Sequence, residues 1–297
     1  MPRQPKPAVA SQPLRLFVCG FGRVGTALAT QASRAGVTLV GIETRDVARA
    51  RDARRLRGAA NGDLAHANLV ALTVPDSALA AVVATLLPRL RRGQVVFHCS
   101  GSLTLSPLAA VEAAGALPAS LHPYCSIASG ETPLKGAACA LDGSPRARAT
   151  LRKLALAVGL RPLAKPPTDR LRYHLSAVLT VASAGVASLA AARLLAAAGT
   201  SDAEARHALA EILRSVAFNL DHASPAAALT GPFARGDVTR IRQQLNALRG
   251  DADALALYRA VGRFSAHAAM ALSEADRTAV EAVLKEPPPD DVTLKSR

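Results

Sequence analysis

Three glycines at the spacing GxGxxG form the most informative pattern in this sequence. They follow an apolar run typical of a strand, residues 14–19, and they open a helical pattern over residues 23–35. In that context the first glycine permits a tight turn, the second lets the backbone approach a pyrophosphate, and the third lets the helix pack closely on the strand. The start of the helix offers free N–H groups and positive potential to phosphates. We therefore expect a dinucleotide, and not merely a glycine-rich turn, at Gly20-Phe21-Gly22-Arg23-Val24-Gly25.

The segment after the second predicted strand, residues 37–42, indicates which dinucleotide binds. An acidic residue there bonds the ribose hydroxyls of NAD, whereas an arginine accepts the 2′-phosphate of NADP. Glu43-Thr44-Arg45 carries both signals, and Arg49 follows one helical turn later. Thr44 offers a hydroxyl, and the planar guanidinium of Arg45 suits a phosphate. We expect NADP rather than NAD, with Glu43 serving NAD as the alternative.

Two further motifs end predicted strands. Val74-Pro75-Asp76 ends the strand at residues 68–74, and Ser100-Gly101 follows the strand at residues 94–98. Open α/β sheets bind their ligands at the carboxyl ends of strands, so we expect both motifs to contribute to the cofactor site. The alternative is that each is an ordinary turn, because Pro-Asp starts helices and Ser-Gly is common in loops.

Two histidines and a tyrosine are candidates for proton transfer. His122 ends a predicted strand, and Tyr173 and His174 lie one turn into a long predicted helix, residues 169–198. Histidine exchanges a proton near neutral pH, which hydride transfer to a carbonyl or imine requires, and tyrosine can donate in the same reaction. The alternative for each is a buried or capping residue without a chemical role.

Strand and helix patterns alternate through the first half of the chain. Predicted strands cover residues 14–19, 37–42, 68–74, 94–98, 117–121 and 137–141, and predicted helices cover residues 23–35, 47–57, 77–90 and 105–114. This alternation predicts a doubly wound, Rossmann-type parallel sheet covered on both faces. Later patterns are helical, over residues 146–158, 169–198, 202–222, 238–248, 251–272 and 274–284. We expect an α/β domain, residues 14–145, and an all-α domain, residues 146–286.

The long predicted helix contains an uncharged stretch, residues 175–192, close to the length that spans a membrane. Serine, threonine and glycine dilute the stretch, and Arg193 ends it. We expect it to be buried in protein, in the core of the helical domain or at a two-fold dimer interface, and not in a membrane. Thr168, which follows two prolines, is the expected N-cap of this helix.

Composition limits which partners the protein can bind and indicates its cellular compartment. The formal net charge is +14, and only six of the 36 basic residues are lysine. Aromatic residues, which stack on bases, are scarce: the chain has no Trp, three Tyr and six Phe. With so few aromatic residues and no recognisable motif, we expect no nucleic-acid partner. Four dispersed cysteines without a CxxC pair indicate no metal site and are typical of the reducing cytoplasm. Residues 1–13 and 287–297 are expected to be loose tails, and the first lacks the apolar core of a signal peptide.

The order of these motifs resembles that of a known family, the Rossmann-like oxidoreductases with a DUF2520 C-terminal domain. These are similar to pyrroline-5-carboxylate reductase and to the 6-phosphogluconate dehydrogenase superfamily. The resemblance covers residues 14–285, and its most specific piece is the run LTGPFARGD at residues 229–237. It also rests on the glycine fingerprint, Thr44-Arg45, Val74-Pro75-Asp76, His98-Cys99-Ser100-Gly101-Ser102, Leu121-His122-Pro123 and Tyr173-His174.

The resemblance implies an NADP-binding domain, a helical domain that forms a homodimer, and a small-molecule substrate in the cleft between the domains. Arg235 can bind a substrate carboxylate, or Asp237 two residues later can instead cap the next helix. The family commonly has an asparagine two turns after His174, where this chain has Ala182, so an amide that orients substrate is missing unless Ser183 compensates.

We therefore expect an NADP-dependent oxidoreductase. The alternative is an NADP(H)-binding regulatory or scaffold protein without turnover, because a fold does not fix a function. A methyltransferase using the same glycine motif is disfavoured by the helical second half and by Arg45.

Overall fold

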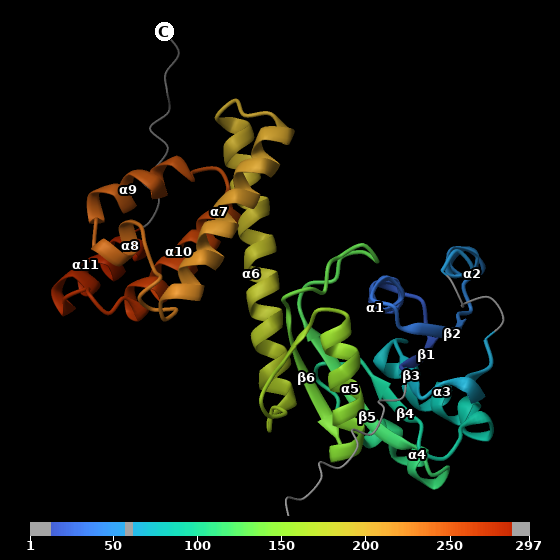
Figure 1. Cartoon of the computed structure of the whole chain (residues 1–297). Coiled ribbons are helices and arrows are strands. Elements are labelled where there is room, and N and C mark those ends of the chain that lie inside the picture. The colour runs from blue at the N-terminus through green and yellow to red at the C-terminus, as the bar shows by residue number, and fades with distance from the viewer. Residues whose placement is uncertain (1–12, 57–61, 287–297) are drawn as a thin grey trace, which may run out of the picture. The chain divides into compact units, whose positions relative to one another are not determined.

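A computed structural model describes residues 13–56 and 62–286 (Figure 1). The tails predicted at the two ends lie almost entirely outside these ranges. The chain divides into two compact units after Val181, a position inside one long helix. The predicted fold class, a Rossmann-type α/β part followed by helices, is confirmed.

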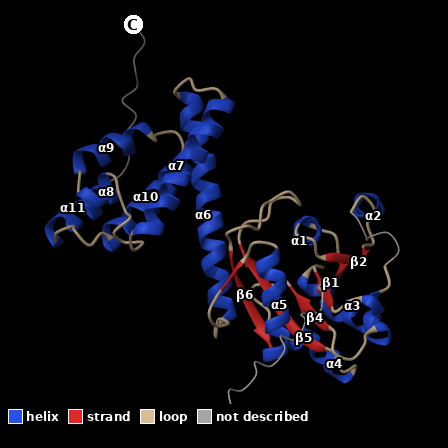
Figure 2. Ribbon diagram, in the orientation of Figure 1, coloured by secondary structure: helices blue, strands red, loops and turns tan. Residues whose placement is uncertain are grey.

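Within the described residues the first unit contains one seven-stranded sheet (Figure 2). Its strands are β1 (Arg15–Cys19), β2 (Thr38–Glu43), β3 (Leu69–Leu72), β4 (Val95–His98), β5 (Leu117–Tyr124), β6 (Ala138–Gly143) and β7 (Arg161–Pro162). Their order across the sheet is β2-β1-β3-β4-β5-β6-β7. β1 to β5 pair in parallel, as the alternation of strands and helices predicts.

β6 runs antiparallel to β5, so the prediction of a wholly parallel sheet is wrong at this edge. A parallel neighbour needs a long crossover, which is usually a helix. Residues 125–137, between the two strands, contain no helix, and the chain therefore returns in the opposite direction.

Helices cover both faces of the sheet because successive strand residues point to opposite faces. On β1, Leu16 and Val18 belong to one buried cluster, together with α1 (Arg23–Arg34) and α5 (Pro145–Ala157). Phe17 and Cys19 belong to the other, together with α3 (Leu79–Leu86) and α4 (Ala109–Ala113). α2 (Val47–Ala53) follows β2.

The core of the sheet extends past residue 145, where the helical patterns of the second half begin. Leu151 and Leu154 of α5 are fully buried in the same cluster as Leu141 of β6. α5 therefore covers the antiparallel edge of the sheet, which would otherwise expose its apolar face to water.

The second unit is helical. Together with the later part of α6 (Arg170–Ala197) it contains α7 (Asp202–His222), α8 (Pro232–Arg235), α9 (Val238–Ala247), α10 (Ala252–Ala268) and α11 (Glu274–Lys285). Ile241, Ala266 and Val280 lie at the centre of its core. The patterns predicted every helix here except the single turn of α8. Asp237 caps α9 by accepting a hydrogen bond from the N–H of Arg240 at 2.9 Å, as one of the two alternatives for this turn predicted.

α6 differs from its prediction in two ways. Asp169, not Thr168, caps it, since its carboxylate accepts from the N–H of Arg172 at 2.9 Å. Its apolar stretch, with a mean hydropathy of 1.8, is long and apolar enough to cross a membrane by length and composition alone, but none of the stretch is buried in the structure. The expectation that it lies in the core of its own chain is therefore wrong, and the two-fold interface stays a prediction.

Candidate active site

A cavity of about 1060 Å³ opens at the carboxyl ends of β1, β2 and β3. The glycine-rich turn, the junction of β2 with α2, and the start of α3 form its walls. Most of the residues predicted to bind a cofactor line it: Gly20, Phe21, Gly22, Arg23, Val24, Thr44, Arg45, Val74 and Pro75. The other four, Gly25, Asp76, Ser100 and Gly101, lie outside this lining.

The glycines at the turn are required by close contacts. Gly20 has a φ of +96°, and a Cβ on it would lie 2.8 Å from the carbonyl carbon of Thr73. A Cβ on Gly25 would lie 2.2 Å from the carbonyl oxygen of Gly20, so α1 packs directly on the turn. The hydroxyl of Thr73 donates to that same oxygen at 2.6 Å. No sequence pattern distinguishes Thr73 for this supporting role.

Four arginines and two carboxylates line the cavity: Arg23, Arg45, Arg49, Arg54, Glu43 and Asp46. Both carboxylates are already paired with arginines. Asp46 caps α2 and lies 3.3 Å from Nε of Arg49. Glu43 lies 2.6 Å from Nη2 of Arg89, a residue that the sequence did not single out. The cavity is therefore suited to a strongly anionic ligand.

A second cluster brings together the three residues predicted to transfer protons. The hydroxyl of Tyr173 lies 3.1 Å from Nδ1 of His122. The rings of His122 and His174 meet edge to face with centroids 5.8 Å apart. Both rings contact Gly101, where a Cβ would lie 2.6 Å from Nδ1 of His174 and 2.7 Å from Nε2 of His122. Gly101 therefore leaves the space that the two histidines occupy.

Burial shifts the pKa values of His122 and Tyr173 in this cluster. It lowers the pKa of His122 to about 4, with further lowering by the neighbouring His174 and Arg170. Burial also raises the pKa of Tyr173 to about 12. At neutral pH His122 is thus uncharged and Tyr173 keeps its proton, so the tyrosine hydroxyl can donate to Nδ1 of His122.

Ser100 and Asp76 connect the ends of two strands. The hydroxyl of Ser100 donates to the carboxylate of Asp76 at 2.7 Å, which joins the turn after β4 to the turn after β3. His98, at the end of β4, is fully buried, and its Nδ1 accepts from the N–H of Ser100 at 3.2 Å. The motifs at these strand ends therefore form one hydrogen-bonded unit beside Gly101.

Arg170 is the main residue of this cluster that the sequence analysis missed. Its side chain is 7% exposed, and its Nη2 donates to the carbonyl of Ser100 and to the hydroxyl of Ser120, each at 3.1 Å. Its Nε and Nη1, together with Nδ1 of His174, are buried without a hydrogen-bond partner in the described structure. The spacing of four residues to His174 is visible in the sequence, but nothing there distinguishes Arg170 from a surface arginine.

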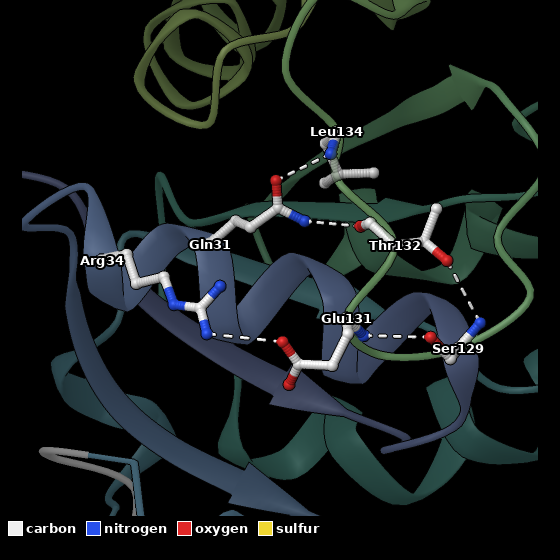
Figure 3. Close-up of polar contacts among 6 residues, drawn as sticks. All are labelled: Gln31, Arg34, Ser129, Glu131, Thr132 and Leu134. Atoms are coloured by element: carbon white, nitrogen blue, oxygen red, sulfur yellow. Dashed lines mark hydrogen bonds and ion pairs between the residues drawn. The ribbon is translucent and has the colours of Figure 1, made fainter. Parts of the chain in front are cut away.

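The loop between β5 and β6 is fastened to α1, as Figure 3 shows. The side-chain amide of Gln31 donates to the carbonyl of Thr132 at 2.9 Å and accepts from the N–H of Leu134 at 2.7 Å. A Cβ on Gly130 would lie 2.3 Å from Cγ2 of Thr26, in the first turn of α1. The loop therefore lies against the helix whose start forms the glycine-rich turn.

Arg235, the residue predicted to bind substrate, belongs to the second unit. It is an exposed residue at the end of α8. Its contact with a substrate carboxylate stays a prediction.

Two family models match the chain. A Rossmann-like domain covers residues 3–123, and the domain of unknown function DUF2520 covers residues 137–264. A search of curated proteins finds no significant match to the sequence.

Several solved structures share the fold. A protein from Bacteroides fragilis, provisionally assigned as an NADP oxidoreductase, has a TM-score of 0.71 at 23% identity, over 86% of this chain and 98% of its own. An imine reductase from Pseudomonas sp. has a TM-score of 0.60 at 19% identity, over 87% and 96%. A reductive aminase from Aspergillus terreus, solved with NADPH and ethyl levulinate, has a TM-score of 0.55 at 21% identity, over 92% and 93%. As the order of its motifs predicted, the chain joins a Rossmann-like domain to a DUF2520 domain.

Proposed function

We propose that this chain is an NADP-dependent oxidoreductase that transfers hydride to or from a small-molecule substrate. The observation that carries the proposal is the cavity of about 1060 Å³ at the glycine-rich turn, whose carboxylates are paired and whose other charges are arginines. This volume is slightly above the usual range for small-ligand sites, roughly 300–1,000 Å³, and leaves room for a ligand as large as a dinucleotide.

The residues present fit both anionic groups of NADP(H), the pyrophosphate and the 2′-phosphate. The start of α1 offers its free N–H groups to the pyrophosphate, and a Cβ on Gly22 would already lie 3.6 Å from the guanidinium of Arg49. Arg45 and Arg49 would hold the 2′-phosphate. NAD would need Glu43 to bind its ribose. Because Glu43 is paired with Arg89, the site favours NADP.

The cofactor would supply the hydride, and this chain would supply proton transfer and orientation. We assign His174 as the group that exchanges a proton with the substrate oxygen or nitrogen, since its Nδ1 has no partner among the described residues. The Tyr173–His122 pair holds the ring of His122 beside it. The structures that share the fold include an imine reductase and a reductive aminase with NADPH, which supports a carbonyl or imine substrate.

We further propose that the protein is a cytoplasmic homodimer and not a membrane protein. Apolar side chains are exposed on α6 and α7, among them Leu189, Ile212 and Phe218. At its other end α6 carries Arg170 and His174, which lie against the sheet of the first unit. A second copy of the chain would cover the exposed apolar residues.

The test is to titrate the purified protein with NADPH and NADH, and then to follow NADPH oxidation across a panel of ketones, imines and 2-oxo acids. We expect NADPH to bind more tightly and at least one class to turn over. His174→Ala should keep its NADPH affinity and lose most turnover, because proton transfer contributes about 10²–10⁴-fold in rate. His66→Ala, at an exposed position in the turn before β3, is the matched control.

Two other outcomes of this experiment would contradict the proposed function. Stoichiometric NADPH binding without turnover on any substrate class would favour a regulatory or scaffold protein. Failure to bind either cofactor would overturn the proposal as a whole.

A further inference from the structure

The pairing of Glu43 with Arg89 has a consequence for cofactor choice. Glu43 ends β2 and lines the cavity beside Arg45. A free carboxylate at this place attracts ribose hydroxyls and repels a 2′-phosphate. Whether Glu43 is free or neutralised therefore affects which dinucleotide the cavity prefers.

The fold holds Arg89 in place to meet this carboxylate. Phe17 of β1 is paired with Gly41 of β2, and a Cβ on Gly41 would lie 2.6 Å from the Phe17 ring. Glu43, two residues further along β2, lies on the same face of the sheet. The guanidinium of Arg89 lies over the buried Phe17 ring, 5.8 Å from its centroid, and its Nη2 is 2.6 Å from the carboxylate of Glu43.

Neither Asp46 nor Cys19 neutralises the carboxylate of Glu43. Asp46 is occupied as the cap of α2 and by Arg49. Cys19, the neighbour of Glu43 across the β1–β2 pairing, adds no second negative charge, because burial raises the pKa of its thiol to about 11 and keeps it protonated. Arg89 is thus the cation that contacts Glu43 within the described chain.

We propose that Arg89 determines cofactor specificity from outside the cavity: it neutralises Glu43 and thereby lets the site accept the 2′-phosphate of NADP and disfavour NAD. This inference rests on the proposed NADP-binding function. Arg89 is a positioning residue, because it acts through Glu43 and does not line the cavity itself.

The experiment is a double-mutant cycle of Arg89→Met and Glu43→Gln, which keep the side-chain sizes similar. The dissociation constants of NADPH, NADH, 2′,5′-ADP and 5′-AMP are measured by calorimetry, so no substrate is needed. We expect Arg89→Met to lower the preference for the 2′-phosphorylated ligand of each pair by roughly three- to tenfold, as one unpaired charge near the phosphate implies. In the Glu43→Gln background the same change should alter that preference by less than about twofold.

Two further variants separate charge from structure. Arg89→Lys keeps the charge and should retain most of the preference, whereas Arg91→Met removes an exposed arginine two residues away and should leave it unchanged. An unchanged preference in Arg89→Met, or an equal shift in the Glu43→Gln background, overturns the inference while NADP binding stands. A wild-type protein that binds NADPH no more tightly than NADH overturns the proposed cofactor instead.

Discussion

Arg45 is the residue on which direct recognition of the 2′-phosphate depends. It is exposed at the end of β2, and the carboxylates on either side of it are held by Arg89 and Arg49. Its guanidinium is therefore left to bind an anion. Arg45→Ala should weaken NADPH binding by roughly 1.5–3 kcal/mol, or about ten- to a hundredfold, and change NADH binding little.

Calorimetric titration of both cofactors checks this prediction, with Arg51→Ala on the exposed side of α2 as the matched control. Equal losses for NADPH and NADH would show that Arg45 does not contact the 2′-phosphate, and would return Glu43 to its alternative role with the NAD ribose.

His122 predicts a dependence of stability on pH. Burial, His174, Arg170 and His98 lower its pKa from 6.5 to about 4, against an opposite effect of Asp76. The unfolded chain therefore binds a proton between these values that the folded chain does not. The contribution to the free energy of unfolding is complete above pH 6.5 and is lost as the pH falls, by up to ~3 kcal/mol at pH 4.

Urea unfolding of wild type and His122→Asn between about pH 7.5 and about pH 4, a range that covers the titration window, measures this difference. The variant should lose less stability on acidification than the wild type. His98, whose pKa burial also lowers, is present in both proteins, so the difference between the two curves reports His122 together with its charge interactions. Identical pH dependence would mean that His122 is not buried as the structure has it.

Local sequence patterns predicted the position of the glycine turn at the end of β1 and of Tyr173 and His174 in the first turns of α6, because each is set by neighbours in the chain. Arg170, Arg89 and Thr73 were not predicted. Their partners lie 70, 46 and 53 positions away, since Arg170 donates to Ser100, Arg89 pairs with Glu43, and Thr73 donates to Gly20. Such contacts depend on the order of strands in the sheet, which hydrophobic periodicity alone does not specify.

At the scale of elements, periodicity predicted the longer strands and helices but not their directions, and it missed β7, which has two residues. The period of an apolar pattern shows which face of an element is buried. This period is the same whether a strand runs parallel or antiparallel to its neighbours. β6 was therefore placed correctly in the sequence and wrongly in the sheet. α8 was missed because a single turn shows no helical period.

The loop between β5 and β6 depends on Gln31 for its attachment to α1 (Figure 3). Gln31→Ala removes both hydrogen bonds and leaves the carbonyl of Thr132 and the N–H of Leu134 without this partner. The free energy of unfolding should fall by about 1–3 kcal/mol. Hydrogen exchange at residues 129–134 should also increase.

Gln31→Glu is the matched variant, because it keeps the acceptor for Leu134 and loses the donor to Thr132. It should fall between wild type and Gln31→Ala in both urea unfolding and hydrogen exchange. Arg34→Ala, which removes only the exposed pair with Glu131, should have an effect below about 1 kcal/mol. Unchanged exchange in Gln31→Ala would contradict the attachment.

At the scale of the whole molecule, the exposed apolar residues of α6 and α7 are the surface that the proposed homodimer would bury. A 21-residue helix such as α7 is about 31 Å long, enough to contribute to an interface of about 800 Å² on each copy. A charge placed there would be buried unpaired at the interface. Ile212→Glu combined with Leu189→Glu should therefore convert the dimer to a monomer, measured by sedimentation velocity at matched concentrations. Leu156→Glu, on the exposed side of α5, should leave the dimer intact. A wild-type protein that sediments as a monomer would contradict the homodimer, and one that partitions into vesicles until detergent is added would show that a membrane covers α6 instead.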